Sequence, residues 1–578
     1  MKMRSRLLCA FMLTSLIVAV QTASGATPLI GGTFRISHRG DPISFNGFLD
    51  YWSVSRDLHQ QVFNRLIEVN EKRELIPDLA YSWKVEDGGK TFTFYLYKNV
   101  TWHDGKPFTS ADVKWHWQKL NSSDTVTYVK PMLDGFKSVE TPDDYTVVFK
   151  FSKPKQPLLF GYFQSDTYIH PKHIFDGKDM KTNPANKAPI GTGPFKVIEY
   201  VQDSHVVMEA NKNYFRDRPY LDRLIYRIIP DQRTRLLSFE KGDVDYCDPP
   251  PAEIVRLGKT EGVKLTYTKS TTSHRLTFNF RPEAVSKYPW LSDVRVRRAF
   301  AHAINKTALV ERQWKGFAYV VETAVPEPSG WAYNPNTPVY KYDPAQAERL
   351  LDEAGYKKGS DGIRFKVPWV TYNRPYSVDG SQIIKEMLKQ VGIDIEIRPV
   401  EYVTYVSLYE QGEKGLQDLP VTYNHMGGWP PEEVGSWMHS RPQGGMNMGF
   451  WKDERADELM EQAYLETDIA KRKPLYYELQ EIVAREVPFV FLLAEISVRA
   501  YKAEFQNVES VWSTSWIPWD RVWWTKGTPI VTATTRTTSP TTVQPPPADG
   551  TWMLAPAAII IVAVLAVSMY LRSKRKPK

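Results

Sequence analysis

Cysteine is scarce in this sequence, where it accounts for 2 of 578 residues. Cys9 lies in an N-terminal segment that we expect to be cleaved, so the mature chain keeps Cys247 alone. A single cysteine can form neither an intramolecular disulfide nor a thiolate metal cluster. The folded domains must therefore be stabilised by packing, without covalent cross-links.

Sequence signatures of catalysis are also missing. The chain has no G-x-S-x-G elbow, no H-E-x-x-H, no phosphate-binding loop and no C-x-x-C. His103 and Asp104 could form a base and its orienting acid, but adjacent residues on a tight turn more often serve structure. A secreted hydrolase would need a clustered acid pair or a nucleophile, and a sensor would need a cytoplasmic output domain. We predict no enzyme activity, no catalytic residues, no metal site and no cofactor.

Positive charge is in excess only at the two ends of the chain. The net charge is +8, and it is carried by Lys2, Arg4, Arg6 and five basic residues after Leu571. Removing these eight from the 74 lysines and arginines leaves 66, which equals the 66 aspartates and glutamates. The remaining chain therefore has no electrostatic reason to bind nucleic acid, and we predict no such partner.

Long apolar runs mark both ends. Residues 1–26 combine basic residues, an apolar run and small residues up to Ala26, which is typical of a secretory signal peptide. Residues 552–571 carry no charge and are long enough to span a bilayer. The basic residues 572–578 follow and place the C-terminus in the cytoplasm. A Thr- and Pro-rich stalk, 525–551, precedes the helix. We expect a single-pass cell-membrane protein whose bulk lies outside the cell or beneath a surface layer.

A hairpin and a capped helix are predicted between residues 75 and 120. Asp87-Gly88-Gly89 supplies the positive φ angles of a tight turn between two alternating runs. Thr109 and Asp112 have the spacing of a capping box, and Trp117 belongs to the apolar stripe of the helix that follows. This segment, which includes WHDGKPFTSADV, resembles the extracytoplasmic solute-binding proteins of peptide-type ABC importers, the dipeptide, oligopeptide and nickel group.

Other segments are similar to the same family. They are GTGPF at 191–195 and the long run from His274 to Asn305, in which a strand leads into a helix. A βαβ pattern is predicted from a strand at 365–370, a helix at 381–390 that ends at Gly392, and a strand at 393–397. A late helix is expected at 474–484.

The resemblance implies an α/β protein with the two-lobed fold of periplasmic binding proteins (class II, cluster C) and an extra small domain. Lobe I is expected at 27–60, 190–277 and 498–524, the small inserted domain at 61–189, and lobe II at 278–497. The implied function is capture of oligopeptides by hinge closure and delivery to an ABC permease that works with separate ATPase subunits. The protein is expected to be a monomer. Its stalk and helix resemble an archaeal way of tethering binding proteins.

The loop at 422–431, TYNHMGGWPP, is the predicted centre of ligand recognition. Gly427-Gly428 allows the backbone to approach a ligand closely, and Trp429 offers a flat face beside it. In peptide-binding relatives an acid of this loop pairs with the peptide's α-ammonium; here Glu432 or Glu433 could take that role. Oligosaccharides of the cello or manno type are the alternative ligand, because some relatives bind them and this chain has 18 tryptophans. The candidate ligand-binding residues are Trp429, Tyr423, Asn424, His425, Gly428, Trp437, Tyr372, Asn373 and Asn279.

Overall fold

The computed structural model describes residues 27–50, 53–70, 74–122, 133–160, 167–401, 419–427, 431, 433–440, 447, 449–466, 468–508 and 518–529. The chain separates into two units, Met1–Ile530 and Val531–Lys578, and all described residues belong to the first. The predicted signal peptide, nearly all of the stalk, the predicted membrane helix and the basic tail lie outside the described residues. Within the described ranges, no helix combines the length and the apolar character needed to cross a membrane.

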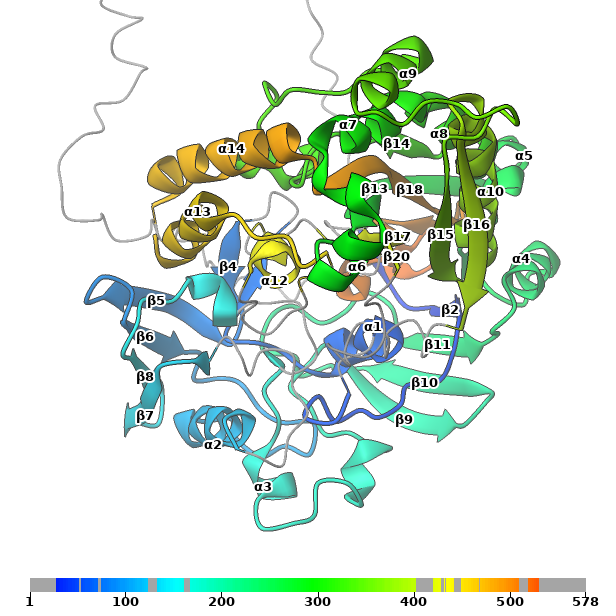
Figure 1. Ribbon diagram of the computed structural model, residues 1–578. Coiled ribbons are helices and arrows are strands. Elements are labelled where there is room, and N and C mark those ends of the chain that lie inside the picture. Colours follow the sequence, from blue (N-terminus) through cyan, green and yellow to red (C-terminus); the bar gives the residue numbers. More distant parts are fainter. Residues whose placement is uncertain are drawn as a thin grey trace, which may run out of the picture. The chain divides into compact units, whose positions relative to one another are not determined.

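An eleven-stranded mixed sheet organises the first unit (Figure 1). Its strands, in spatial order, are β16 (Ile393–Val400), β15 (Phe365–Tyr372), β17 (Val421–Met426), β13 (Val263–Phe278), β18 (Phe489–Lys502), β12 (Tyr246–Cys247), β2 (Thr33–His38), β11 (Arg223–Ile228), β10 (His205–Ala210) and β9 (Phe195–Val201), with β14 (Ala318–Val320) paired to β18. We use lobe I for the half with β12, β2, β11, β10 and β9, and lobe II for the half with β14 to β17.

The two long strands β13 and β18 connect the lobes. The first part of β13 pairs with the end of β18 in lobe I, and the last part pairs with both β18 and β17 in lobe II. Between these parts, from Lys269 to Ser273, the register of β13 against β18 shifts. Such irregularities bend a strand and interrupt its ladder. This crossing is therefore the natural place for a hinge between the lobes.

Each lobe has its own apolar core. The lobe II sheet packs against helices through buried residues such as Trp369, Phe300 and Leu388, and the lobe I core gathers around Phe34. The helices are α1 (Ser53–Val62), α4 (Gln232–Lys241), α5 (Ile254–Leu257), α6 (Pro282–Lys287), α7 (Val294–Ala303), α8 (Lys306–Trp314), α9 (Pro344–Glu353), α10 (Pro375–Gln390), α12 (Glu433–Met438), α13 (Glu454–Leu465) and α14 (Ile469–Glu486). Shorter pairs are β1 (Leu29–Ile30) with β21 (Thr528–Pro529), and β19 (Phe505–Gln506) with β20 (Trp523–Trp524), next to the 3₁₀ turn η8 (Trp519–Arg521).

A separate four-stranded sheet carries the predicted hairpin. Its order is β5 (Ala80–Glu86), β6 (Thr91–Leu96), β8 (Thr146–Phe151) and β7 (Phe136–Asp143), and α2 (Ser110–Leu120) and α3 (Lys172–Phe175) accompany it. The short pair β3 (Ile67–Val69) and β4 (Leu75–Pro77) precedes it. The turn residues Asp87, Gly88 and Gly89 all have positive φ, as predicted. The capping box is also confirmed: the Thr109 amide donates to Asp112 Oδ2 at 3.1 Å.

Two helix boundaries differ from the prediction. α10 begins at Pro375 instead of 381, because proline is well accommodated in the first turn of a helix. α14 begins at Ile469 instead of 474, because the Asp468 side chain accepts a hydrogen bond from Ala470 N and starts the helix earlier. Pro474 therefore lies inside the helix.

Candidate functional site

The carboxyl ends of the parallel strands in the two lobes point toward each other. In lobe I, β2 runs parallel to β11 and β12; in lobe II, β15 runs parallel to β16 and β17. β13 leads into lobe II and β18 leads back, so their antiparallel pairing with β17 and β12 fixes both directions. Ligands of α/β sheets bind beyond such ends. We call this region the interlobe site; its residues are His38, Arg56 and Asp57 from lobe I, and His274, Tyr423, His425, Glu433 and Glu495 from the lobe II side.

On the lobe I side, His38 ends β2 and is buried. Its Nδ1 donates to the Gly40 carbonyl at 2.6 Å, and its Nε2 lies 3.6 Å from Asp57 Oδ2 on α1. The Tyr226 hydroxyl donates to the Asp57 carbonyl at 3.4 Å. Burial raises the pKa of Tyr226, and the charge of Asp57 raises it further, so this phenol stays a neutral donor. The lobe I wall therefore combines an imidazole, a carboxylate and a phenol.

On the lobe II side, His274 connects β17 to β18. Its Nε2 lies 3.1 Å from Glu495 Oε1, and its Nδ1 lies 3.1 Å from the Tyr423 hydroxyl. The His425 ring stands 5.6 Å from the His274 ring, centroid to centroid. Burial lowers the pKa of His425 to about 3, and His274 contributes to this shift, so His425 is neutral at physiological pH. Its Nδ1 has no hydrogen-bond partner within the described residues.

Glu495 lies where β18 crosses between the lobes. Burial alone would raise the pKa of its carboxyl group, but the hydrogen bond from His274 and the nearby His274 charge lower it overall. Glu495 therefore remains an anion next to the hinge, held by a histidine of the neighbouring strand.

The reverse face of β17 is filled by a buried polar cluster. Asn424 Nδ2 donates to Thr277 Oγ1 at 3.0 Å, and the Arg275 guanidinium lies 3.7 Å from the Trp437 ring centroid. Trp437 Nε1 donates to the Gly427 carbonyl at 2.8 Å. These contacts fix the backbone at the end of β17, from which the ligand loop departs.

An acid of lobe II lies beside the end of β17, within electrostatic reach of a base of lobe I. Glu433, the first residue of α12, packs its carboxylate against Gly427, where a Cβ atom would overlap it. Burial raises the pKa of Glu433 to about 7, and Arg56 of α1 is near enough to oppose that shift. The two charges come from opposite lobes and from positions 377 residues apart. A ligand between the lobes would encounter both.

The sequence profile of the bacterial extracellular solute-binding proteins, family 5, matches residues 74–445. The chain is a member of this family. The oligopeptide-binding protein AppA of Bacillus subtilis is 28% identical over 491 residues, which covers 81% of this chain and 87% of AppA. Heme-binding protein A of Haemophilus influenzae is 28% identical over 452 residues, covering 75% and 81% of the two chains. The structure of Bacillus subtilis AppA in complex with a nonapeptide superposes with a TM-score of 0.71 at 25% identity, covering 86% of this chain and 99% of that one.

Family membership establishes the general role of this solute-binding protein. It is an extracytoplasmic binding protein of ABC transport, it is not an enzyme, and its fold is the two-lobed α/β fold of its structural neighbours. Among the described residues, no three His, Cys, Asp or Glu side chains are placed to hold a metal ion. The substrate-binding role is therefore established, whereas the ligand is a matter for inference.

The structure places five of the predicted ligand residues of this solute-binding protein in two groups. Tyr423 and His425 alternate onto one face of β17, and the Tyr372 hydroxyl accepts from the His425 amide at 3.3 Å. Asn424 and Trp437 lie on the reverse face described above. Two others lie apart from these groups: Asn373 is exposed and donates to Glu401 at 2.9 Å, and Asn279 is buried and donates to the Leu419 carbonyl at 2.9 Å. Trp429 and Gly428 lie outside the described residues, so their contribution stays a prediction.

Sequence reasoning missed most of the interlobe site. Arg56, Asp57, His274 and Glu495 were not among the candidates, since nothing local distinguishes them from ordinary polar residues. Their only common property is the strand topology that brings them together. For the lobe II pair, the signal available in advance was the position of His274 at the start of the long run that resembles the family.

Proposed function

We propose that this solute-binding protein captures oligopeptides between its lobes and delivers them to an ABC permease. The observation that carries the proposal is that Glu433 and Arg56, an acid and a base from opposite lobes, lie near enough to interact electrostatically. A free peptide carries an α-ammonium and an α-carboxylate, and charge-assisted hydrogen bonds to such groups are stronger than neutral ones. Membership in a family whose relatives include oligopeptide-binding AppA supports the same class of ligand.

The remaining polar groups suit a peptide backbone. His425 presents an Nδ1 atom without a protein partner in the described residues, and Asp57 Oδ1 is likewise buried without one. Buried polar atoms cost stability unless they are paired. Peptide N–H and C=O groups would supply one donor to Asp57 and one partner to His425. Recognition of the backbone would permit peptides of varied sequence.

An oligosaccharide is the second candidate ligand. Three aromatic rings surround His274: the Tyr376 ring is 5.7 Å, the Trp314 ring 5.8 Å and the Tyr423 ring 5.8 Å away, centroid to centroid. Aromatic faces suit sugar rings, and hydroxyl groups could use the same histidines and carboxylates. We favour the peptide because charge opposed across two lobes recognises an ionic ligand better than a neutral one.

A thermal-shift screen tests the proposal. Residues 27–529 are heated with tripeptides to pentapeptides and with cello- and manno-oligosaccharides of matched length. Ligand at 100 times its Kd adds about 2.7 kcal/mol to the free energy of unfolding, which raises the melting temperature. We expect stabilisation by peptides and none by sugars. Stabilisation by a sugar alone would contradict peptide binding and favour the second candidate.

We also infer that residues 552–571 anchor the protein in the membrane, with 572–578 in the cytoplasm and a stalk at 530–551. The stalk is shorter than the predicted 525–551, because Thr528–Pro529 form β21, which pairs with β1. The uncharged run and the basic residues behind it support this orientation. Protease added outside intact cells should release one large soluble fragment. A membrane-protected fragment that retains the stalk would show that the orientation is wrong, and a protein recovered whole in the medium without protease would show that the anchor is absent.

A further inference from the structure

A pocket lies between lobe I and the segment that holds the predicted hairpin. It encloses about 680 Å³, part of which is open solvent. Its walls come from the end of α1, from β3 and β4, from Tyr168, and from η8 near the end of the described chain. Among its described lining residues, none belongs to residues 278–497, the expected lobe II. We call it the junction pocket; the interlobe site is a different place, because that site needs both lobes.

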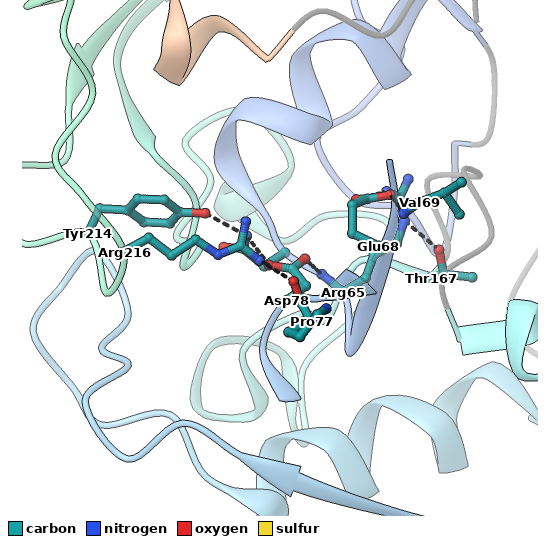
Figure 2. A network of polar contacts seen from close by, with 9 residues as sticks. Arg65, Glu68, Val69, Pro77, Asp78, Thr167, Tyr214 and Arg216 are labelled. Carbon is teal, nitrogen blue, oxygen red and sulfur yellow. Dashed lines mark hydrogen bonds and ion pairs between the residues drawn. The ribbon is translucent and has the colours of Figure 1, made fainter. Parts of the chain in front are cut away.

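The inner wall of the junction pocket is a network of ion pairs that satisfy one another (Figure 2). Asp78 accepts from Arg216 Nη2 at 2.7 Å, from the Arg65 amide at 2.7 Å and from Asn64 Nδ2 at 2.8 Å. Glu68 accepts from Arg65 Nη1 at 2.7 Å and from the Val69 amide at 2.8 Å. These two carboxylates are occupied within the protein, so they shape the wall and leave ligand contact to other groups.

Arg216 retains donors that the network does not use. Its Nη2 donates both to Asp78 and to the Pro77 carbonyl, at 2.7 and 2.8 Å. Its Nε and Nη1 have no hydrogen bond to the part of the chain that the structure describes. The side chain is about one-third exposed, at 34%. Arg521 is exposed beside it and also lines the pocket. Two guanidinium groups can therefore receive an anionic group.

Tyr168 and Asp520 are two further lining residues that could contact a bound molecule. The Tyr168 hydroxyl belongs to a side chain that is 1% exposed, and it has no hydrogen-bond partner within the described residues. The Arg65 guanidinium covers its ring at 3.8 Å, which fixes the phenol in place. Asp520 is half-buried, and its carboxylate makes no hydrogen bond to another side chain in the described part of the chain. A buried hydroxyl without a partner destabilises the protein, and a bound polar molecule that accepts its hydrogen bond would remove that cost.

The pocket is lined by groups of both charge types. The lining includes the carboxyl groups of Glu68, Asp78 and Asp520 and the guanidinium groups of Arg216 and Arg521. A molecule that carries both charges gains from each side. We propose that the junction pocket binds a small zwitterion of the free amino acid class, with its carboxylate at Arg216 and Arg521 and its ammonium at Asp520. The Tyr168 hydroxyl then donates to the same carboxylate.

Calorimetric titration of the full chain with glycine tests the proposal, with L-alanine as a second probe. We expect saturable binding of both. Tyr168→Phe removes one hydroxyl and keeps the ring under Arg65, so it should weaken glycine binding about three- to tenfold. Asp520→Asn removes the partner of the ammonium and should weaken it about tenfold or more. Acetate has only the carboxylate and methylammonium has only the ammonium. Neither should therefore show saturable binding in the concentration range in which glycine does.

Two controls separate this pocket from the interlobe site and from loss of folding. Tyr340→Phe removes a hydroxyl bonded to the Ala484 carbonyl at 2.7 Å, far along the chain in lobe II, and should leave glycine affinity unchanged. Glu433→Gln should also leave it unchanged. The absence of saturable glycine binding at tens of millimolar would overturn the proposal. Acetate that binds as tightly as glycine would overturn it too. A third contradicting result is that Glu433→Gln abolishes glycine binding whereas Tyr168→Phe and Asp520→Asn leave it unchanged.

Discussion

Glu433→Gln should lower the affinity for an unblocked tripeptide about 30-fold at neutral pH, and leave the affinity for the N-acetylated tripeptide unchanged. The substitution keeps the shape of the side chain and removes its charge. The loss corresponds to about 2 kcal/mol, within the range for a hydrogen bond to a charged group. Calorimetric titration of both peptides against both proteins measures it. The acetylated peptide is the matched control because it lacks only the ammonium.

The same interaction gives the affinity a characteristic pH dependence. The pKa of Glu433 is raised to about 7 by burial in the free protein, and only its ionised form pairs with an ammonium. Affinity should therefore rise about tenfold per pH unit below 7. Above about pH 8 it should fall again, since the peptide's α-amino group loses its proton. In Glu433→Gln the acid limb of this profile should be flat.

Glu432→Gln provides the sequence-matched comparison, since it removes the same charge one residue away. We expect it to preserve both the affinity and the acid limb of the profile. Equal losses from the two substitutions would show that the loop acts through its general charge, without a specific partner for the ammonium. A loss confined to Glu432→Gln would transfer the role to that residue.

The second large effect concerns the GTGPF segment. A Cβ atom at Gly191 would overlap the Val62 carbonyl at the end of α1, and one at Gly193 would overlap the Gln61 carbonyl. Both neighbours are backbone, so no side-chain rotation relieves the overlap. We expect Gly191→Ala to destabilise the protein by about 3 kcal/mol, near the upper end for overpacking. Denaturant unfolding of residues 27–529 measures the change.

Gly435→Ala is the control for this prediction. Gly435 lies in α12, its φ is not positive, and the nearest atom that an added Cβ would meet is the Met460 sulfur at 4.0 Å. Alanine favours a helix over glycine by about 1 kcal/mol, so this substitution should be neutral or stabilising. A Gly191→Ala variant as stable as Gly435→Ala would show that α1 can move away from the segment.

Local patterns predicted local structure well. The hairpin turn at Asp87-Gly88-Gly89 and the capping box of Thr109 depend on backbone conformations that only certain residues favour. Both features can therefore be predicted from the residue types. Gly392 has a φ of +84°, as a helix C-cap requires, and β16 follows directly at Ile393. The family resemblance then supplied the two-lobed architecture, which no local pattern contains.

The candidate site was less predictable because it depends on strand direction and on contacts distant in sequence. The alternation of residues along β17 places Tyr423 and His425 on one face and Asn424 on the other. It does not tell which of the two faces packs against the helices and which one contacts the buried Arg275. Arg56 and Glu433 have no recognisable pattern in common. The segment at 422–431 could be singled out because glycine and tryptophan are conspicuous there, whereas the opposite wall consists of ordinary polar residues. Its prediction as a loop was wrong for Thr422 to Met426, which belong to β17 because they pair with β13.

Closure of the lobes requires motion about the strands that join them and a change in the polar contacts between them. The lobes are joined by β13 and β18, whose pairing shifts register at the crossing. The segment with the hairpin also contacts lobe II: Gln156 Nε2 donates to the Tyr464 carbonyl at 3.1 Å and to the Glu466 carbonyl. Polar contacts of this kind contribute about 1 kcal/mol each, so they can form and break as the lobes move.

Small-angle X-ray scattering of residues 27–529, with and without a tripeptide at calorimetrically proven saturation, tests closure of the lobes most directly. Hinge closure around a ligand brings two compact bodies together. The radius of gyration should therefore be smaller with the peptide, and Glu433→Gln at the same peptide concentration should show a smaller decrease. Superimposable scattering curves for the free and the saturated protein would contradict capture by closure.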